Sequence, residues 1–218
     1  MVVKGLNTRG VAEFCRALVL RPHLLLPQLS VRDLNDVSFQ ALKDHGFQGV
    51  VFDKDNTLTV PHRHEMAPHL QSSLDECRRV FGDRVLIFSN SAGSSDDCGF
   101  TQAAEIEAQL RIAVLTHNEK KPGGIEHVEA HFGVDPATLV MIGDRYSTDM
   151  LFGNLHGLLT IRTDQFTREG ESAVNAQLQR VEKAVVRLLE RAGVTALVHP
   201  LLPDARAVTK CDDHEVVA

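Results

Sequence analysis

The sequence predicts an α/β domain of the doubly wound kind, with helices on both faces of a central parallel sheet. Short apolar runs bounded by turn residues predict buried strands, and the stretches between them repeat apolar residues every three or four positions, as helices do. Strands that are apolar on both faces need cover on both faces, which flanking helices supply. The chain has 218 residues, enough for one sizeable core.

The predicted strands follow one another along most of the chain. They cover residues 50–52, 85–90, 112–117, 139–144 and 158–163. Helical spacing of apolar residues occupies the stretches between them, at 66–80, 103–110 and 125–132. A further helix is expected over residues 171–192. Its predicted core-facing side chains are Val174, Leu178, Val181, Val185 and Leu188.

Composition limits the partners and the kind of site. The formal net charge is -6, so the whole molecule has no basic bias and nucleic acid is not expected as a partner. The 4 cysteines lie at wide, irregular intervals, which favours neither a zinc site nor a disulfide framework. Because the sequence has no run of about 18 apolar residues, no membrane-spanning segment is expected.

Polar side chains stand at the carboxyl ends of three predicted strands. Asp53 and Asp55 follow the first strand, Ser89 and Asn90 end the second, and Asp144 ends the fourth. In open parallel sheets the ligand crevice lies just beyond the carboxyl ends of the strands. We therefore expect these residues to meet at one rim.

The acidic residues of this rim predict a metal site. Asp53, Asp55, Asp144 and Asp149 would raise one another's pKa at close range, so they stay ionised together only if a cation joins them. Carboxylates with waters and a phosphate suit Mg²⁺, and Lys121 is the expected positive partner. The Gly/Ser-rich stretch after the second strand offers hydroxyls and amides to a phosphate. Together these groups indicate phosphoryl transfer through an aspartyl-phosphate.

Four short motifs carry a resemblance to a known family. "DKDNTL", "IFSN", "KKPG" and "GDRYSTD" resemble, in order and spacing, the four motifs of the haloacid dehalogenase (HAD) superfamily of phosphohydrolases. The resemblance implies that Asp53 is the nucleophile and Asp55 the general acid and base. It also implies that the Asp53 side chain, the Asp55 backbone carbonyl and Asp144 hold Mg²⁺, with Asp149 bracing these ligands.

The same resemblance assigns the phosphate-binding residues. Ser89, Asn90 and Lys121 would hold the oxygens of the transferring phosphoryl group. Lys120 is the alternative lysine, and Lys121 is favoured because it directly precedes a proline, as the lysine of the family usually does.

The spacing of the motifs leaves no room for a cap domain. Large HAD enzymes insert a cap after the first motif or between the second and third. Here residues 58–84 can hold one helix, and residues 91–120 can hold a short helix and a strand. The expected core is therefore uncapped, and an open site favours substrates whose bulk cannot fit under a cap, such as proteins, nucleic acids or membrane lipids.

A longer resemblance begins with "RPHLLLPQLSVRDLNDVSFQALKDHGFQGVVFDKDNTLTVPH" and continues through "FSNSAGS", "THNEKKPGG" and "GDRYSTDMLFGNLHG". These stretches, which cover roughly residues 20–163, resemble the mitochondrial phosphatidylglycerophosphatases and their bacterial and plant relatives. This resemblance implies a phospholipid substrate, phosphatidylglycerophosphate, which is dephosphorylated to phosphatidylglycerol, the precursor of cardiolipin. It also implies a peripheral enzyme at the matrix face of the mitochondrial inner membrane. Two alternatives stay open: the same chemistry on a soluble phosphoester or phosphoprotein, and a non-catalytic membrane-binding module.

The N-terminal segment is expected to form an amphipathic helix. Val11, Phe14, Cys15 and Leu18 share one helical face among arginines, so the helix could rest on an anionic membrane surface or pack on its own domain. The sequence leaves these two possibilities about equal. The expected division is an N-terminal segment at 1–45, a phosphatase domain at 46–200 and a disordered tail at 201–218.

Overall fold

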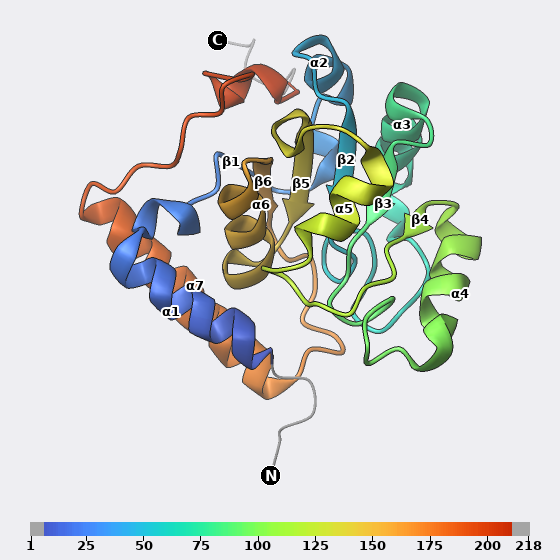
Figure 1. Ribbon diagram of the computed structural model, residues 1–218, viewed down its shortest axis with the longest axis horizontal. Coiled ribbons are helices and arrows are strands. Elements are labelled where there is room, and N and C mark those ends of the chain that lie inside the picture. The colour runs from blue at the N-terminus through green and yellow to red at the C-terminus, as the bar shows by residue number, and fades with distance from the viewer. Residues whose placement is uncertain (1–6, 211–218) are drawn as a thin grey trace, which may run out of the picture.

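The computed structural model of the protein describes residues 7–210 (Figure 1). Its core is a sheet of six parallel strands in the order β1-β6-β5-β2-β3-β4. The strands are β1 (Leu29–Val31), β2 (Gly49–Phe52), β3 (Val85–Ile87), β4 (Ala113–Val114), β5 (Leu139–Gly143) and β6 (Leu159–Thr163). The predicted doubly wound α/β fold is confirmed.

Helices cover both faces of this sheet. Within residues 7–210 the α-helices are α1 (Thr8–Leu20), α2 (Phe39–Asp44), α3 (Gln71–Phe81), α4 (Thr101–Leu110), α5 (Ile125–Phe132), α6 (Leu151–His156) and α7 (Ala173–Arg191). Since successive side chains of a strand point to opposite faces, Val50 and Phe52 join the core cluster with α2, α3 and α4, whereas Val51 joins the cluster with α5 and α6.

The central position of β2 decides where the crevice lies. β2 pairs with β3 on one side and with β5 on the other, so Phe52 is in register with both Ile87 and Ile142. The chain runs outward from β2 through β3 to β4 and then returns to the other side of β2 as β5. This reversal is the point at which ligands bind in doubly wound sheets. The ends of β2, β3 and β5 therefore converge there.

One strand was not predicted from the sequence. β1 is a short edge strand that pairs with β6, from Leu29 opposite Ile161 to Val31 opposite Thr163. Its three residues are too few to show the pattern of apolar residues by which a strand is predicted. Residues 29–31 consequently belong to the sheet of the phosphatase domain, although they fall inside the expected N-terminal segment 1–45.

The expected disordered tail is wrong for residues 201–210. Residues Ala205–Val208 form a 3₁₀ turn, and Leu202 and Val208 are buried. The Lys210 amide donates to the Asp36 carbonyl at 2.8 Å, which ties this segment to the 3₁₀ turn before α2. The rest of the expected tail, 211–218, lies outside the described residues.

Helix α7 forms where it was predicted, but only part of its predicted core face packs inward: Leu178 and Val185 are half-buried, and Val185 packs against the cluster that holds Val186. Val174, Val181 and Leu188, which the sequence placed in the core, are 49%, 47% and 62% exposed. Gln179, Glu182 and Val186 are the buried residues instead. The reason is that Glu182 satisfies polar groups of the neighbouring β5–α6 connection, and apolar periodicity does not reveal a buried polar partner.

Helix α1 lies beside α7 on one flank of the domain, and both helices begin at the lower end of the view (Figure 1). Phe14 and Ala17 of α1 are buried in a cluster that also holds Val186 of α7. Cys15 is exposed, and so are Val19 and Leu20 at the end of α1. The helix thus packs on its own domain with one face and leaves apolar side chains in solvent. No helix within residues 7–210 is long and apolar enough to span a membrane.

Candidate active site

Asp53 is the first residue beyond β2, where the buried run of that strand meets the crevice. Its backbone amide donates to the Ile142 carbonyl at 2.8 Å, so the ladder with β5 continues one residue past the strand and fixes the Asp53 backbone. The Asp53 side chain is only 12% exposed. Burial raises the pKa of Asp53 to about 6, against the opposing charge of Lys121.

The β5–α6 connection brings two more carboxylates to the same point. Asp144 directly follows β5, and a single π-helical turn over Tyr146–Met150 turns Asp149 back toward it. A Cβ atom at Gly143 would lie 2.5 Å from the Asp149 side chain, so only glycine allows this close approach. Burial, then the charges of Asp149 and Asp53, raise the pKa of Asp144 well above its usual range.

These three carboxylates could hold a metal ion. One oxygen from each of Asp53, Asp144 and Asp149 lies within 4.8 Å of the others. Lys121 neutralises one of the three charges, and the remaining two match the charge of one divalent cation. An all-oxygen set of carboxylates suits Mg²⁺. The donor set and its uncompensated charge therefore fit the predicted ion. The Asp55 carboxylate is not part of this cluster in the described chain.

Lys121 is the lysine that the fold brings to the carboxylates. Its side chain is 1% exposed, and Nζ lies 2.8 Å from Asp53 Oδ1 and 2.5 Å from Asp149 Oδ1. Burial by itself would lower the pKa of Lys121, but the Asp149 and Asp53 carboxylates raise it above its ordinary value. Lys120 pairs instead with the exposed Asp96, and its own side chain is 23% exposed.

Asn90 acts on the lysine through the backbone. Asn90 Oδ1 accepts the Lys121 amide at 2.8 Å, which holds the loop that carries the lysine. Ser89 is buried at the end of β3, and its hydroxyl lies 3.0 Å from that of Ser91. Ser91 Oγ in turn donates to Asp55 Oδ2 at 3.3 Å. The loop after β3 therefore connects the phosphate-binding candidates to Asp55.

Asp55 stands on the wall of the crevice, tied to the loop that follows β2. Its Oδ1 accepts hydrogen bonds from Lys54 Nζ and from the His62 amide. Lys54 is buried, and it also donates to Thr59 Oγ1 at 3.1 Å and to the Arg63 carbonyl at 3.0 Å. With 31% of its side chain exposed, Asp55 is accessible to solvent, as a proton donor and acceptor must be.

A cavity of about 350 Å³ opens beside the carboxylates. It is lined by the predicted residues Asp53, Asp55 and Asp144, by Asn56, Pro61 and His62 of the following loop, by Arg145, and by Gly170, Glu171, Ser172, Asn175 and Gln179 at the start of α7. The sequence did not single out Arg145 or α7 as parts of the site. Arg145 could have been noticed because it lies inside the "GDRYSTD" motif, whereas nothing in the sequence shows that α7 returns to the crevice.

The arrangement has the parts of a phosphoryl-transfer site. A carboxylate lies beside a fully buried ammonium, two further carboxylates could complete a cation site, and a fourth carboxylate, two residues after the first in the same loop, reaches solvent. Hydroxyl and amide donors of the loop after β3 lie next to them. All of these groups come from the carboxyl ends of adjacent strands.

Comparison with known proteins identifies a family that matches most of the chain. A family model described as "Mitochondrial PGP phosphatase" matches residues 9–166. A chloroplastic/mitochondrial phosphatidylglycerophosphate phosphatase 1 from Arabidopsis thaliana is 39% identical over 94% of the chain, and the chain spans 60% of that protein. A chloroplastic phosphatidylglycerophosphate phosphatase 1 from Chlamydomonas reinhardtii is 42% identical over 93% of the chain and 76% of its own length.

A mitochondrial phosphatidylglycerophosphatase from Saccharomyces cerevisiae is 30% identical over 84% of the chain and 99% of its own length. The family match covers more than half of the chain, and it includes the four motifs that converge on the crevice. The chain therefore belongs to the mitochondrial PGP phosphatase family of the HAD superfamily.

Proposed function

We propose that the protein is a Mg²⁺-dependent phosphatase that converts phosphatidylglycerophosphate to phosphatidylglycerol through an aspartyl-phosphate at Asp53. The observation that carries the proposal is the meeting of Asp53 with Lys121 at 2.8 Å inside a cluster of carboxylates within 4.8 Å of one another. The names of the relatives from Arabidopsis, Chlamydomonas and yeast support the substrate.

In the first step the Asp53 carboxylate attacks phosphorus, and the bond from phosphorus to the glycerol oxygen breaks. Asp55 donates its proton to that oxygen as it leaves. In the second step Asp55 takes a proton from a water molecule, which attacks the same phosphorus and releases inorganic phosphate. This step restores the Asp53 carboxylate and the protonated Asp55. Asp55 suits both tasks because it is accessible to solvent while Asp53 is nearly enclosed.

The other residues hold the reacting groups. Lys121 and the Ser89 hydroxyl bind the phosphoryl oxygens, Asn90 holds the lysine loop, and Asp149 fixes the lysine Nζ. The Asp53 and Asp144 carboxylates and the Asp55 backbone carbonyl would hold Mg²⁺, which would supply positive charge to stabilise the phosphoryl oxygens. Asp149 braces this set from a fully buried position.

The open crevice supports a substrate that remains part of a membrane. Residues 58–84 contribute one α-helix, α3, and residues 91–120 contribute one, α4, so neither stretch builds a cap domain. Access to the carboxylates is thus compatible with a headgroup presented by a bilayer.

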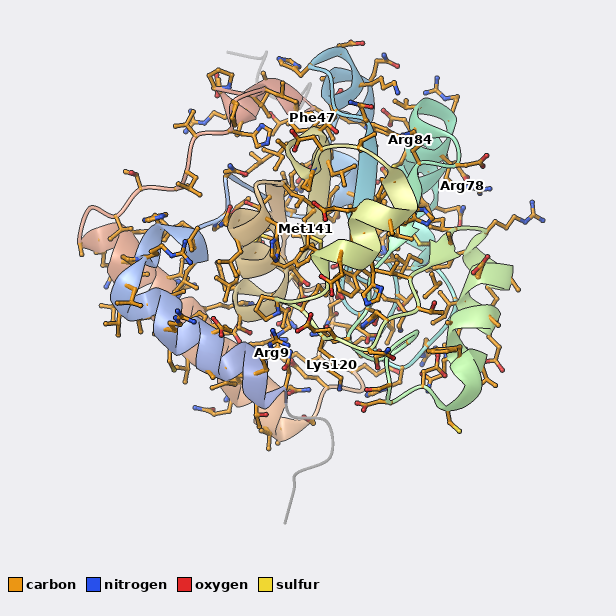
Figure 2. The ribbon with its side chains drawn as sticks, viewed as in Figure 1. Arg9, Phe47, Arg78, Arg84, Lys120 and Met141 are labelled. Carbon is orange, nitrogen blue, oxygen red and sulfur yellow. The ribbon has the colours of Figure 1, made fainter. Side chains whose placement is uncertain are left out.

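We also propose that the N-terminal segment holds the enzyme on an anionic membrane, at the matrix face of the mitochondrial inner membrane. Val19 and Leu20 are 79% and 65% exposed, and the Arg16 side chain is 70% exposed on the same helix. Helix α1 begins against the catalytic lysine loop, because Asn7 Nδ2 donates to the Lys121 carbonyl at 2.7 Å. Figure 2 shows Arg9 and Lys120 at this same end of the domain.

The test is release of phosphate from phosphatidylglycerophosphate in mixed micelles, with Mg²⁺ and with a chelator. A panel of soluble substrates, including a sugar phosphate, a nucleotide and a phosphopeptide, is measured beside it. We expect Mg²⁺-dependent release that is fastest from the lipid. Faster turnover of the soluble esters would overturn the lipid assignment, and no release from any substrate would favour a non-catalytic module.

A further inference from the structure

Arg145 is a cation on the cavity wall that the proposed chemistry does not use. It directly follows the metal-ligand candidate Asp144, and its side chain is 20% exposed where it lines the cavity. Its Nη2 atom donates to Glu182 Oε1 at 3.1 Å. Its Nε atom is buried and has no hydrogen-bond partner among residues 7–210.

Glu182 of α7 fixes the position of this guanidinium. Its side chain is 1% exposed, and it accepts hydrogen bonds from the Ser147 hydroxyl at 2.6 Å and from the Ser147 amide at 3.3 Å, besides that from Arg145. A buried ion pair with a purely structural role is expected to satisfy both partners, since an unmade hydrogen bond in a buried group is unfavourable. Here Glu182 is satisfied and Arg145 is not. The remaining donors of Arg145 are therefore available to a ligand.

The same cavity has an unpartnered acceptor. Glu171 Oε1 is buried without a hydrogen-bond partner in the described chain, and Glu171 lines the cavity together with Arg145. The amide side chains of Asn175 and Gln179 lie on the α7 side of the same cavity. A ligand that satisfies both orphaned atoms must bring an anionic acceptor to Arg145 and a hydroxyl donor to Glu171.

Guanidinium groups match the paired oxygens of a phosphate and stay charged at all physiological pH values. The phosphoryl group that is transferred is already held by Lys121 and the cation site, so Arg145 is suited to a second anion. We propose that Arg145, positioned by Glu182, forms a subsite for the phosphodiester of the substrate, and that Glu171 accepts the hydroxyl of the glycerol between the two phosphates. This inference rests on the proposed function, because the substrate named there has both groups.

The test compares two soluble monoesters that differ in the second phosphate. Glycerophosphoglycerophosphate, the deacylated headgroup, contains the phosphodiester, and glycerol 3-phosphate lacks it. We expect Arg145→Gln to lower kcat/KM for the headgroup by about 10- to 100-fold, which is the range for losing a hydrogen bond to a charged group. The same variant should change kcat/KM for glycerol 3-phosphate by less than about 3-fold.

Two further variants separate recognition from folding. Glu182→Gln should raise KM for the headgroup by a larger factor than KM for glycerol 3-phosphate, because it loosens Arg145 without removing it. Arg191→Gln removes the same charge from the far, exposed end of α7, and it should leave kcat/KM unchanged for both substrates. Circular dichroism of each variant checks that it is folded. Arg145→Lys keeps the positive charge but loses the paired N–H donors of the guanidinium, so its kcat/KM for the headgroup should lie between those of the wild type and Arg145→Gln.

Each other outcome rejects the subsite. If Arg145→Gln lowers kcat/KM equally for both substrates, Arg145 acts on the transferred phosphate or on the fold. If it lowers kcat/KM for neither substrate, Arg145 has no part in binding. A wild-type enzyme that hydrolyses phosphatidylglycerophosphate but does not prefer the headgroup over glycerol 3-phosphate would refute the subsite while the proposed function stands. A wild-type enzyme that releases no phosphate from the lipid would refute both.

Discussion

Lys121 is held in place by complete burial and by two ion pairs. It is fully buried, and its ammonium contacts two carboxylates that no other lysine of the described chain reaches. The neighbouring Lys120 differs in every one of these respects, since it pairs with an exposed aspartate at the surface. The two adjacent lysines therefore form a natural pair of test and control positions.

Lys121→Met should lower the free energy of unfolding by about 3–5 kcal/mol, because it leaves buried carboxylates without their partner. It should also abolish phosphate release. Lys120→Met should lower the free energy of unfolding by less than about 1 kcal/mol and keep activity, since its ion pair is partly exposed. Urea unfolding and the micelle assay measure both effects. A larger loss of activity from Lys120→Met than from Lys121→Met would contradict this assignment.

At this scale the sequence predicted the residues that stand at strand ends. Asp53, Ser89 and Asp144 could be placed at one rim because strands β2, β3 and β5 are apolar runs with clear ends. Glu182 could not be placed, because it is separated from Arg145 by 37 residues and lies in a helix whose apolar pattern indicated another face. Its role depends on a tertiary contact that the sequence does not record.

At the scale of elements, α1 packs on its own domain, which is one of the two alternatives that the sequence left open, and the membrane contact of its exposed face is our proposal. It buries Phe14 and Ala17 against its own domain, and it exposes Val19 and Leu20 to solvent. Its N-terminal cap residue, Asn7, donates a hydrogen bond to the carbonyl of Lys121. The packing of α1 could have been expected from its amphipathic pattern, but its contact with the lysine loop joins residues that are 114 positions apart.

The double variant Val19→Gln, Leu20→Gln should weaken binding to anionic liposomes by about 10-fold or more, because each exposed apolar side chain contributes about 1 kcal/mol when it enters lipid. Binding of the wild type should also weaken with added salt. Both positions are exposed, so stability should change little. Vesicle co-sedimentation measures the binding.

Helix α7 provides the matched control. Val174 and Leu188 are exposed apolar residues of α7, and the double variant Val174→Gln, Leu188→Gln removes a comparable apolar area from the neighbouring helix. We expect it to bind liposomes as the wild type does. Wild-type binding by the α1 variant, or an equal loss in the α7 variant, would show that α1 is not the membrane contact.

For the whole molecule, the carboxylate cluster links folding, pH and metal binding. The pKa of Asp53 is raised to about 6 and that of Asp144 is raised well above its usual range, so the metal-free folded state binds protons more tightly than the unfolded chain does. Stability from these groups is then fully present below about pH 4 and is lost as the pH rises through about 6. A divalent cation bound by the cluster would remove this penalty by neutralising the ionised carboxylates.

We therefore expect the melting temperature of chelator-treated protein to fall between about pH 5 and about pH 7. Added Mg²⁺ should raise it more at pH 7 than at pH 5, because protons compete with the ion at the lower pH. Asp144→Asn should show a smaller Mg²⁺ effect and a flatter pH dependence than the wild type. If Mg²⁺ raises the melting temperature as much at pH 5 as at pH 7, the link between the carboxylate cluster and the ion is contradicted.

The most direct test of the central claim is the rate of phosphate release from phosphatidylglycerophosphate by Asp53→Asn in the presence of Mg²⁺. This change removes the nucleophilic oxygen while nearly keeping the shape of the side chain. We predict a fall of at least about 10³-fold, with the circular dichroism spectrum unchanged. Release at a rate close to that of the wild type would show that Asp53 does not form the covalent intermediate.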